Sequence, residues 1–559
     1  MHTNLIISFI YLLCNLAVSI SWYYGRDEPD RWSVGEIWPL PQHVKYGKRN
    51  RTVSPGMISF EFGERKDCDI LLMNGKNYLQ KWMFPFPVHA KKGGINYVVT
   101  VNVTESCPSG FPQHGDSEEY KLRVSIDGAS ITSQTVWGAV RAMESFSQLI
   151  FYDQKKSKYK VRTVEIHDYP RFPIRGIMID TSRHYISTNV IKRQLDIMAM
   201  NKMNVLHWHL VDTESFPYVS PAFPQLSKID IMAMNKMNVL HWHLVDTESF
   251  PYVSTVFPQL SKIGAYSPNH VYTPDTVRDI LQFARIRGIR VIPEFDLPGH
   301  TGSWRGQPGL LTECFDEKLK PTYPNLFDPS KEDNFQFLSK FFTEVVNTFP
   351  EEFLHLGGDE VDQFIEECWE RNEKIQKFME QKSFGNNTTL LENYFFDKLM
   401  NVVDNLPSKR KAIFWQEVFD NNKPKKGSIF HVWKGSTHED IMNEVDLITS
   451  KGFNAIVSAC WYLNYIKYGA DWKDEIAGSA PSNSRYYYCD PTAFNGTEVQ
   501  KALVLGGIAA MWGEFVDSTN IESRLWPRAS AVAERLWSPE ERTLEVSGMK
   551  AHISNCVII

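Results

Sequence analysis

The stretch FLHLGGDEVD, residues 353–362, predicts a buried strand that ends in a turn. It begins with the apolar run that is typical of strands buried on both faces. Gly357 and Gly358 then allow the backbone to turn or to approach another group closely. Because strand side chains alternate between faces, Asp359 and Glu360 can share a pocket only beyond the strand's end. Such a pair suits a proton donor beside a charge stabiliser, although an acidic loop capping the next helix fits the same residues.

Strand-like runs of this kind alternate with amphipathic helices from about residue 171 onward, which indicates βα units and a parallel sheet. Eight parallel strands that are each followed by a helix form a (β/α)8 barrel, whose active site lies at the C-terminal ends of the strands. We therefore predict an α/β fold, with a barrel catalytic domain at residues 166–559. The eight predicted strands are Gly176–Asp180, Asn204–Leu210, Ile289–Phe295, Phe353–Gly357, Ala412–Trp415, Ser428–Trp433, Ala455–Cys460 and Leu503–Met511.

The segment before the barrel, residues 20–165, has short strands and turns instead. It carries no catalytic constellation, so we predict a small α+β domain with a structural or docking role. The predicted elements are strands at Met57–Phe62, Tyr97–Val103 and Tyr120–Ile126 and a helix near Gln134–Tyr152.

Residues 1–19 predict a secretory signal peptide, with small residues at the usual cleavage spacing; a buried N-terminal helix is the alternative. No later stretch is apolar for long enough to span a membrane. The net charge of -6 gives no argument for binding nucleic acid or an anionic membrane. A secreted chain can form disulfides, and we pair Cys68 with Cys107, Cys314 with Cys368 and, more weakly, Cys460 with Cys489. Glycosylation sequons are present at Asn50, Asn102, Asn386, Asn387 and Asn495.

The side chains that follow the predicted strands change in kind along the chain. The first four strands lead to charged residues and the last four to aromatic ones. Because the C-terminal ends of barrel strands meet at one face, we expect carboxylates ringed by indoles. Indole faces pack on the C–H faces of a sugar while its hydroxyls accept and donate hydrogen bonds, so a sugar pocket is predicted. These residues are Asp180, Arg183, Asp212, Asp296, His300, Asp359 and Glu360, then Trp415 with Glu417, Trp433, Trp461 with Tyr462, and Trp512 with Glu514.

A 34-residue tandem duplication interrupts the pattern: residues 196–229 recur as 230–263, differing only at Pro221/Thr255 and Ala222/Val256. Each copy contains half a helix, the strand NVLHWHL and the loop after it. A closed barrel cannot simply accept a ninth strand, so one copy should lie outside it. We expect the first copy to supply the second strand, because its helix runs without interruption from a cap at Ser187 or Thr188. The second copy would then be an insertion in a loop at the active-site face; the opposite assignment stays open.

His207 and His209, repeated as His241 and His243, share one face of this strand, a spacing found in metal-dependent barrel hydrolases. They lie before the strand's end, however, below the mouth where a metal would bind. We therefore predict histidines that are hydrogen-bonded inside the barrel, with no metal or cofactor. A metal-dependent hydrolase is the alternative.

Several motifs together resemble the β-N-acetylhexosaminidases of glycoside hydrolase family 20. The resemblance covers about residues 25–540, and the lysosomal β-hexosaminidase subunits are the most similar branch. It rests on DTSRHY (180–185), HWHLVD (207–212), PEFDLPGHT (293–301), HLGGDEV (355–361), WQEVFD (415–420), WYL (461–463), WGE (512–514), RLWPRASA (524–531) and WPLP (38–41).

The resemblance implies an exo-glycosidase that removes terminal β-linked N-acetylglucosamine or N-acetylgalactosamine from glycoconjugates. The implied mechanism is substrate-assisted and retaining, with the 2-acetamido oxygen as nucleophile. Glu360 would protonate the leaving oxygen and then activate water, Asp359 would orient the acetamido N–H, and Tyr462 would hold the acetamido oxygen. The implied sugar-binding residues are Arg183, Asp212 or its copy Asp246, His300, Trp415, Trp433, Asn464, Trp512 and Glu514. From the residues alone, a buried ion pair of Arg183 with Asp212 and a loop cap at His300 remain open.

The resemblance also implies a glycan substrate, a homodimer and a lysosomal or secreted location. No cation directly follows Asn464, which favours neutral over sulfated sugars. Two departures from the family pattern are the duplication and the shortened C-terminus, where Cys556 lacks a partner. A catalytically impaired glycan-binding relative is therefore the alternative function.

Overall fold

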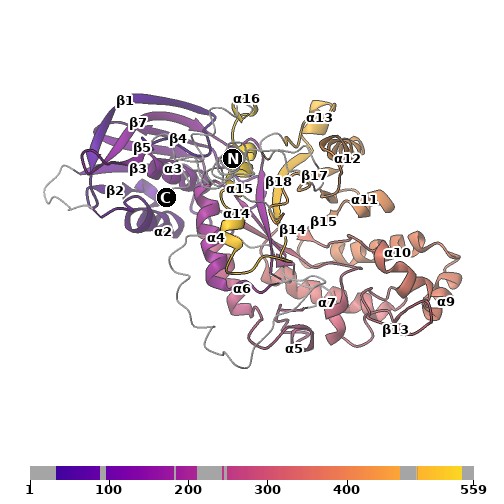
Figure 1. The fold of residues 1–559 in the computed structure, drawn as a ribbon. Helices are drawn as coiled ribbons and strands as arrows, with labels where there is room; N and C mark the ends of the chain where they lie inside the picture. The colour runs from indigo at the N-terminus through magenta and orange to yellow at the C-terminus, as the bar shows by residue number, and fades with distance from the viewer. Residues whose placement is uncertain are drawn as a thin grey trace, which may run out of the picture.

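Two sheets organise the residues that the computed structural model describes, namely 33–87, 96–181, 184–209, 242–243, 249–465, 486 and 489–543. In Figure 1 the sheet of the N-terminal domain lies on one side of the molecule and the barrel with its surrounding helices on the other. The two expected structural units are thus present within the described residues, and the barrel follows the smaller domain.

The N-terminal sheet runs in the order β1-β7-β4-β5-β3-β2, with β6 paired to β7. The strand at 97–103 is confirmed at both ends, but the predicted helix is too long, because the chain turns into β6 directly after α3. Thr135 caps α3 by accepting a hydrogen bond from the Gly138 N–H at 3.2 Å. The elements are β1 (His43–Val53), β2 (Ile58–Glu61), α2 (Asp69–Asn77), β3 (Tyr97–Val103), β4 (Tyr120–Val124), β5 (Gly128–Ser133), α3 (Val136–Gln148), β6 (Ile150–Asp153) and β7 (Lys158–Asp168).

Eight parallel strands form the predicted closed barrel, and β9 closes it by pairing with both β8 and β11. The strands read β8 (Ile174–Asp180), β9 (Val205–His209), β11 (Arg290–Glu294), β14 (Phe353–His355), β15 (Lys411–Trp415), β16 (Ile429–Val432), β17 (Asn454–Val457) and β18 (Val504–Met511). Inside the barrel, one apolar cluster is built from side chains such as Met178, Ile292 and Ile456. A larger cluster lies between the strands and the helices, so the barrel is packed on both faces, as its apolar strands predict.

The helices of the barrel domain surround these strands (Figure 1). Thr437 begins one of them with a capping box in which it and Asp440 bond each other's backbone. The main helices are α4 (Thr188–Met200), α6 (Pro274–Ile286), α7 (Glu332–Thr348), α10 (Thr388–Asp404), α12 (His438–Ser450) and α15 (Arg528–Trp537). Shorter ones are α5 (Gln259–Gly264), α8 (Asp362–Ile365), α9 (Glu373–Gln381), α11 (Glu417–Asn421), α13 (Glu498–Lys501), α14 (Ile521–Leu525) and α16 (Glu540–Thr543).

Both copies of the duplicated segment contribute to the barrel domain. The first copy supplies β9, as expected. The second copy is not simply an insertion, because Phe250, Tyr252 and Leu260 are fully or almost fully buried in the main core. A short strand of that copy, β10 (Trp242–His243), also pairs with the end of β11. The first copy therefore supplies the strand β9, and the second copy supplies the buried residues that follow from Phe250 onward.

A buried charge network joins the two domains. Glu118 accepts hydrogen bonds from Arg175 of β8 and from Arg141 of α3, at 2.7–2.8 Å. Arg141 also donates to the carbonyls of Arg287 and Gly288 at the end of α6. Because an unpaired buried charge is costly, this network fixes how the N-terminal domain sits on the barrel.

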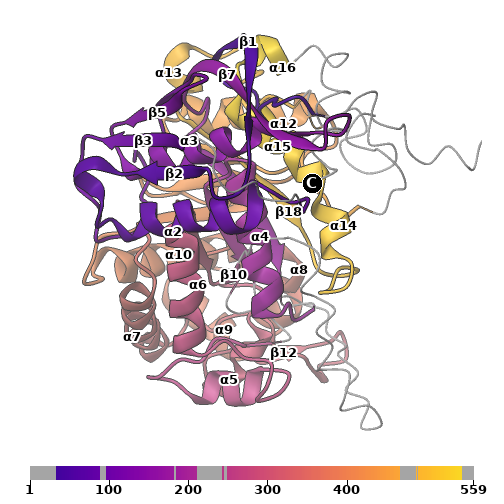
Figure 2. The ribbon, with the colours of Figure 1, turned by 90° about the vertical axis from the view of Figure 1, so that its left-hand side faces the viewer.

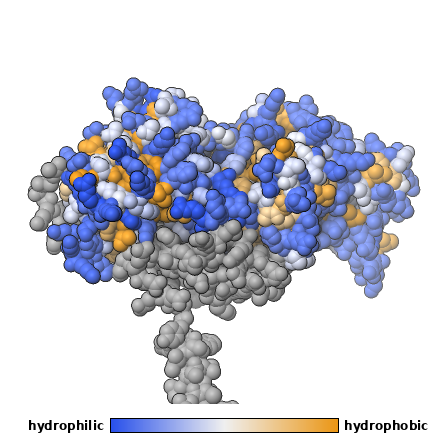
Figure 3. Space-filling view, turned by 90° about the horizontal axis from the view of Figure 1, so that it is seen from above, coloured by the Kyte–Doolittle hydropathy of each residue, from blue (hydrophilic) through white to orange (hydrophobic). Residues whose placement is uncertain are grey.

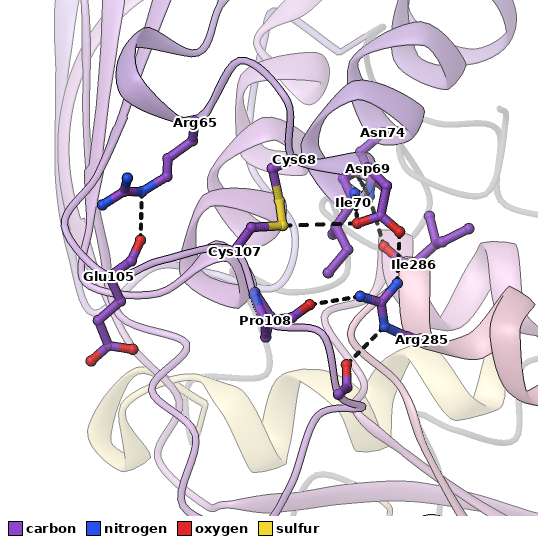
Figure 4. Close-up of a disulfide and its surroundings, with 11 residues drawn as sticks. Arg65, Cys68, Asp69, Ile70, Asn74, Glu105, Cys107, Pro108, Arg285 and Ile286 are labelled. Carbon is purple, nitrogen blue, oxygen red and sulfur yellow. Dashed lines mark hydrogen bonds and ion pairs between the residues drawn. A yellow bond between two sulfur atoms is a disulfide. The ribbon is translucent and has the colours of Figure 1, made fainter.

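The disulfide between Cys68 and Cys107 lies beside a second interdomain contact (Figure 4). Arg285 of α6 pairs with Asp69 at 2.8 Å and donates to the carbonyl of Pro108 at 2.7 Å. Figure 2 shows α2 in front of the barrel helix α6, and Asn74 donates from α2 to the Ile286 carbonyl. The bridges Cys314–Cys368 and Cys460–Cys489 are also formed, so all three predicted pairings are confirmed. Cys14 and Cys556 lie outside the described residues.

The surface fits the secretory prediction without testing it. Asn50, Asn102, Asn386, Asn387 and Asn495 are all exposed, as glycosylation would require. Seen from above, hydrophilic residues cover most of the visible surface, and apolar ones form small groups (Figure 3). Within the described ranges, the helices are too short or too polar to cross a membrane.

Glu144 makes the stability of the domain interface depend on pH. Burial in α3 raises the pKa of this carboxyl to about 7, above the ~4.3 of an unfolded glutamate. Its stabilising contribution is therefore complete below the unfolded pKa and is lost as the pH rises toward and through 7. We expect Glu144→Gln to flatten the fall in melting temperature between pH 5 and 8. A matched Glu61→Gln change, at an exposed position, should leave the slope as in the wild type; an unchanged slope in Glu144→Gln would contradict this assignment.

Candidate active site

The turn after β14 holds two carboxylates in an unusual backbone conformation. Gly357, Gly358 and Glu360 all have positive φ, at 66°, 98° and 53°. Asp296, beyond the end of β11, accepts a hydrogen bond from the Gly358 N–H at 2.9 Å. A non-glycine residue with positive φ is uncommon and is held there by its surroundings, often at a functional site. The glycines thus act as the sequence predicts, by allowing both a turn and a close approach.

Asp359 and Glu360 both face His300, so the turn brings them to one site. The His300 Nε2 atom lies 3.6 Å from Glu360 Oε2 and 3.9 Å from Asp359 Oδ2. The Glu360 side chain is 33% exposed and that of Asp359 is 13% exposed. One carboxyl is therefore accessible to an incoming molecule, while its neighbour is largely enclosed. This arrangement favours a proton donor beside a charge stabiliser over an acidic loop that only caps the next helix.

A methyl group at Gly357 should disable this turn. A Cβ there would lie 1.8 Å from Asp296 Oδ1, and the positive φ adds backbone strain. Since a displacement of about 1 Å can cost 10²-fold in rate, we expect Gly357→Ala to lower kcat by about that factor. Gly385→Ala is a suitable control, because it also has positive φ but has open space around its Cβ position. Equal kinetic losses in the two variants would show that strain alone, and not the contact with Asp296, is responsible.

Aromatic side chains form a connected group at the ends of the later strands. The ring of Trp415 lies 6.4 Å from those of Trp433 and Trp512, and Trp512 lies 6.5 Å from Tyr462. Burial raises the pKa of Tyr462 well above its usual range, so its hydroxyl remains a donor. The expected aromatic set is therefore brought together, with one exception.

Trp461 is that exception, because it belongs to the core and not to the pocket. Burial does not distinguish it, because Trp415 is fully buried as well. The Trp461 indole N–H, however, donates to the Tyr486 carbonyl at 3.1 Å, and its ring belongs to the cluster between the strands and the helices. Its six-membered ring packs over Gly507. Consecutive residues at a strand end point to opposite faces, so Tyr462 faces the barrel and Trp461 cannot.

Glu417 also belongs to the site. The sequence predicts its place at the end of a strand but indicates no role for it. Its carboxylate accepts from Trp433 Nε1 at 2.9 Å and pairs with Lys434 at 2.6 Å. Burial raises its pKa to about 7, and the negative charge of Asp359 acts in the same direction. The order Trp-Gln-Glu after a strand was the available signal, whereas nothing in the sequence indicated Lys434.

Among the polar atoms of the site that are buried without a hydrogen-bond partner in the described residues are Asp359 Oδ1 and Asn464 Oδ1. Buried polar atoms are normally paired, so both are available to a bound molecule. Glu514 follows the Trp512-Gly513 turn, which is held by a hydrogen bond from the Gly513 N–H to Asp180 at 2.8 Å. Arg183, Asp212 and Asp246 lie outside the described residues.

Of the four histidines predicted on the duplicated strand, His207 is the one whose side chain the structure describes, and it is a core residue. His207 is fully buried, and its Nε2 lies 2.8 Å from Glu294 Oε2 inside the barrel. This confirms the expectation of a hydrogen-bonded histidine at that position. The side chains of His209 and of the two copied histidines, His241 and His243, are not among the described ones.

A (β/α)8 barrel with an acid pair and an indole group at the C-terminal ends of its strands defines the class of barrel glycosidases. Comparison with known proteins supports this class. The description "Glycosyl hydrolase family 20, catalytic domain" matches residues 172–229 and 227–540, and "beta-acetyl hexosaminidase like" matches residues 37–149. The chain belongs to glycosyl hydrolase family 20. The two overlapping matches reflect the duplicated segment.

Named relatives cover nearly the whole chain. Beta-hexosaminidase A of Caenorhabditis elegans is 61% identical over 96% of this chain and 90% of its own length. Beta-hexosaminidase subunit beta of Rattus norvegicus is 40% identical over 94% of this chain and 90% of its own length. Among solved structures, the chitobiase of Flavobacterium johnsoniae aligns with a TM-score of 0.71 at 26% identity, covering 93% of this chain and 72% of that one. The chain is thus a glycosidase of the β-hexosaminidase type.

Proposed function

We propose that this enzyme hydrolyses terminal β-linked N-acetylhexosamine by using the substrate's own 2-acetamido oxygen as the nucleophile. The observation that carries the proposal is the turn that presents Asp359 and Glu360 together to His300. The unpartnered oxygen Asp359 Oδ1 suits the acetamido N–H. The buried, protonated hydroxyl of Tyr462 suits the acetamido oxygen. A polar, enclosed group of this kind recognises an N-acetyl sugar better than a plain hexose.

In this mechanism Glu360 donates a proton to the leaving glycosidic oxygen while the acetamido oxygen attacks the anomeric carbon. The oxazolinium ion that forms is opened by water, which Glu360 deprotonates, and the configuration is retained. Asp359 holds the acetamido group in line and stabilises the positive charge that develops. Trp415, Trp433 and Trp512 support the terminal sugar, with His300, Asn464, Glu514, Arg183 and either Asp212 or Asp246 as further binding residues.

A pair of chromogenic substrates tests the proposal. We expect the p-nitrophenyl β-N-acetylglucosaminide to be hydrolysed at mildly acidic pH. The matching β-glucoside, which has a hydroxyl in place of the acetamido group, should react at least about 10³-fold more slowly, because it lacks the tethered nucleophile. Equal rates would contradict substrate assistance. No turnover of either substrate by soluble, folded protein would contradict the activity itself.

We further infer a glycan substrate, a lysosomal or secreted location and assembly as a homodimer. Relatives named as β-hexosaminidase subunits support the assembly. Light scattering of the purified chain tests it, because a monomer at micromolar concentration would contradict the dimer.

A further inference from the structure

Glu294 is a carboxylate at the end of β11 that the proposed mechanism does not use. Its side chain is fully buried. Its Oε1 atom accepts the indole N–H of Trp415 at 2.9 Å and lies 3.2 Å from His355 Nδ1. Its Oε2 atom lies 2.8 Å from Nε2 of His207. One carboxyl group thus connects strands β9, β14 and β15 across the interior of the barrel.

These contacts fix the position of Glu294 closely. An isolated buried carboxylate would be strongly disfavoured, and hydrogen bonds to its oxygens offset that cost. Two of these contacts are hydrogen bonds, with the indole N–H of Trp415 and with Nε2 of His207, and barrel strands hold both partners. The carboxyl therefore cannot move without breaking one of these bonds. A carboxyl group that is held in this way also fixes the orientation of the side chains to which it is hydrogen-bonded.

Two of its partners lead directly to the active site. Trp415 is the member of the aromatic group that contacts both Trp433 and Trp512. His355 lies on β14, four residues before Asp359. The ring of Trp415 is also stacked on His431, at 4.4 Å and 19°. The indole is therefore held at its edge by Glu294 and on one face by His431.

His431 continues the same network on the far side of His355. Its Nδ1 lies 3.4 Å from His355 Nε2, and its Nε2 lies 2.5 Å from the Ser458 hydroxyl, which donates to the Ile508 carbonyl. Burial lowers the pKa of His431 to about 3, so this ring is neutral. The stacking surface under Trp415 is thus uncharged and fixed, which leaves the indole edge at Glu294 as the bonded point of the ring.

We propose that Glu294 is a positioning residue for the sugar site, acting through the indole N–H of Trp415. By fixing the plane of this buried ring, it sets the positions of Trp433 and Trp512, the two partly exposed indoles that contact it and form the wall against which the N-acetyl sugar packs. It does not touch the substrate and takes no part in proton transfer. The inference rests on the proposed function, because it assigns Trp433 and Trp512 to the wall of the sugar site.

A double-mutant cycle on the full chain tests the inference. Glu294→Met removes the acceptor with little change in volume, and Trp415→Phe removes the indole donor but keeps an aromatic face. We expect Glu294→Met alone to lower kcat/KM by about 10- to 100-fold, mainly through kcat, because a misplaced wall misaligns the acetamido oxygen. In the Trp415→Phe background, Glu294→Met should lower kcat/KM by no more than about twofold, because the hydrogen bond between the indole N–H and Glu294 is already absent. Glu294→Gln, which retains one carbonyl acceptor, should recover part of the loss.

Asp168→Asn is the matched control for a purely structural role. Asp168 is also fully buried and also accepts the N–H of a buried indole, that of Trp537 at 3.0 Å, but at the domain interface. This variant should lower the melting temperature and leave kcat/KM unchanged. If Glu294→Met fails to fold, the cycle is run with Glu294→Asp, which keeps the charge and withdraws it by one methylene.

The inference is overturned if the double variant loses kcat/KM by the product of the two single losses, which would mean that Glu294 and Trp415 act independently. It is also overturned if Glu294 variants lose stability but keep the kcat/KM of the wild type. Failure of the proposed function gives a different result, because the wild type itself would then show no selectivity for the N-acetyl sugar over the glucoside.

Discussion

Glu360→Gln is expected to lower kcat on the chromogenic N-acetylglucosaminide by about 10²- to 10⁴-fold, the contribution of a positioned general acid and base. The amide keeps the shape of the side chain but can no longer supply a proton to the leaving oxygen. The fold should be preserved, because Glu360 is partly exposed and its unusual backbone is set by the preceding glycines and Asp296. Circular dichroism and the melting temperature of the purified variant check that preservation.

The choice of leaving group makes this experiment more specific. A substrate with a strongly acidic leaving group needs little protonation, so Glu360→Gln should be impaired much less on it. Asp359→Asn should be impaired on both substrates, since Asp359 acts on the acetamido group and not on the leaving oxygen. Glu366→Gln, an exposed carboxylate just beyond the same turn, is the matched control and should be as active as the wild type. If Glu360→Gln retained more than a tenth of the activity, Glu360 would not be the general acid.

The barrel could be predicted from sequence because its strands are apolar runs at regular intervals, and such runs suit only a sheet covered on both faces. The ends of the strands could also be located, and with them the carboxylate pair, since the active face follows from the fold. The N-terminal sheet was harder to predict. Its longest strands, β1 and β7, mix exposed charges with buried residues and were missed. Their positions depend on pairing with partners more than 100 residues away, which local patterns do not record.

The site was predictable as a set of strand ends but not as a set of contacts. Trp461 and Tyr462 are neighbours in sequence, yet one packs in the core and the other faces the site. Glu417, Lys434 and Glu294 have roles that depend on distances between different strands. Two nearly identical copies of one segment pose the same problem, because the sequence is compatible with either assignment and only burial separates them. The structure uses the strand of the first copy and the buried loop residues of the second.

Excision of residues 210–243 is expected to leave an active and more stable enzyme. The deletion joins His209 to Leu244 and restores one continuous copy. The connection between β9 and Ser249 then shortens from 39 residues (210–248) to five (244–248). Closing the shorter loop costs about 2 kcal/mol less conformational entropy, so the urea midpoint of unfolding should rise, with kcat not reduced. Loss of activity in a folded variant would instead show that residues 210–243 are needed for catalysis.

A second deletion tests which copy supplies the loop. Excision of residues 230–263 yields the same chain, except that Pro221 and Ala222 replace Thr255 and Val256. In the structure, the N–H and hydroxyl of Thr255 both donate to Glu344 of α7, at 2.6 and 2.5 Å. Proline has neither donor, so this version should be less stable by roughly 1–3 kcal/mol. Glu344→Gln should narrow the difference between the two deletions, since it weakens the acceptor. Equal stability of the two chains would mean that the loop of the first copy serves the fold as well as that of the second.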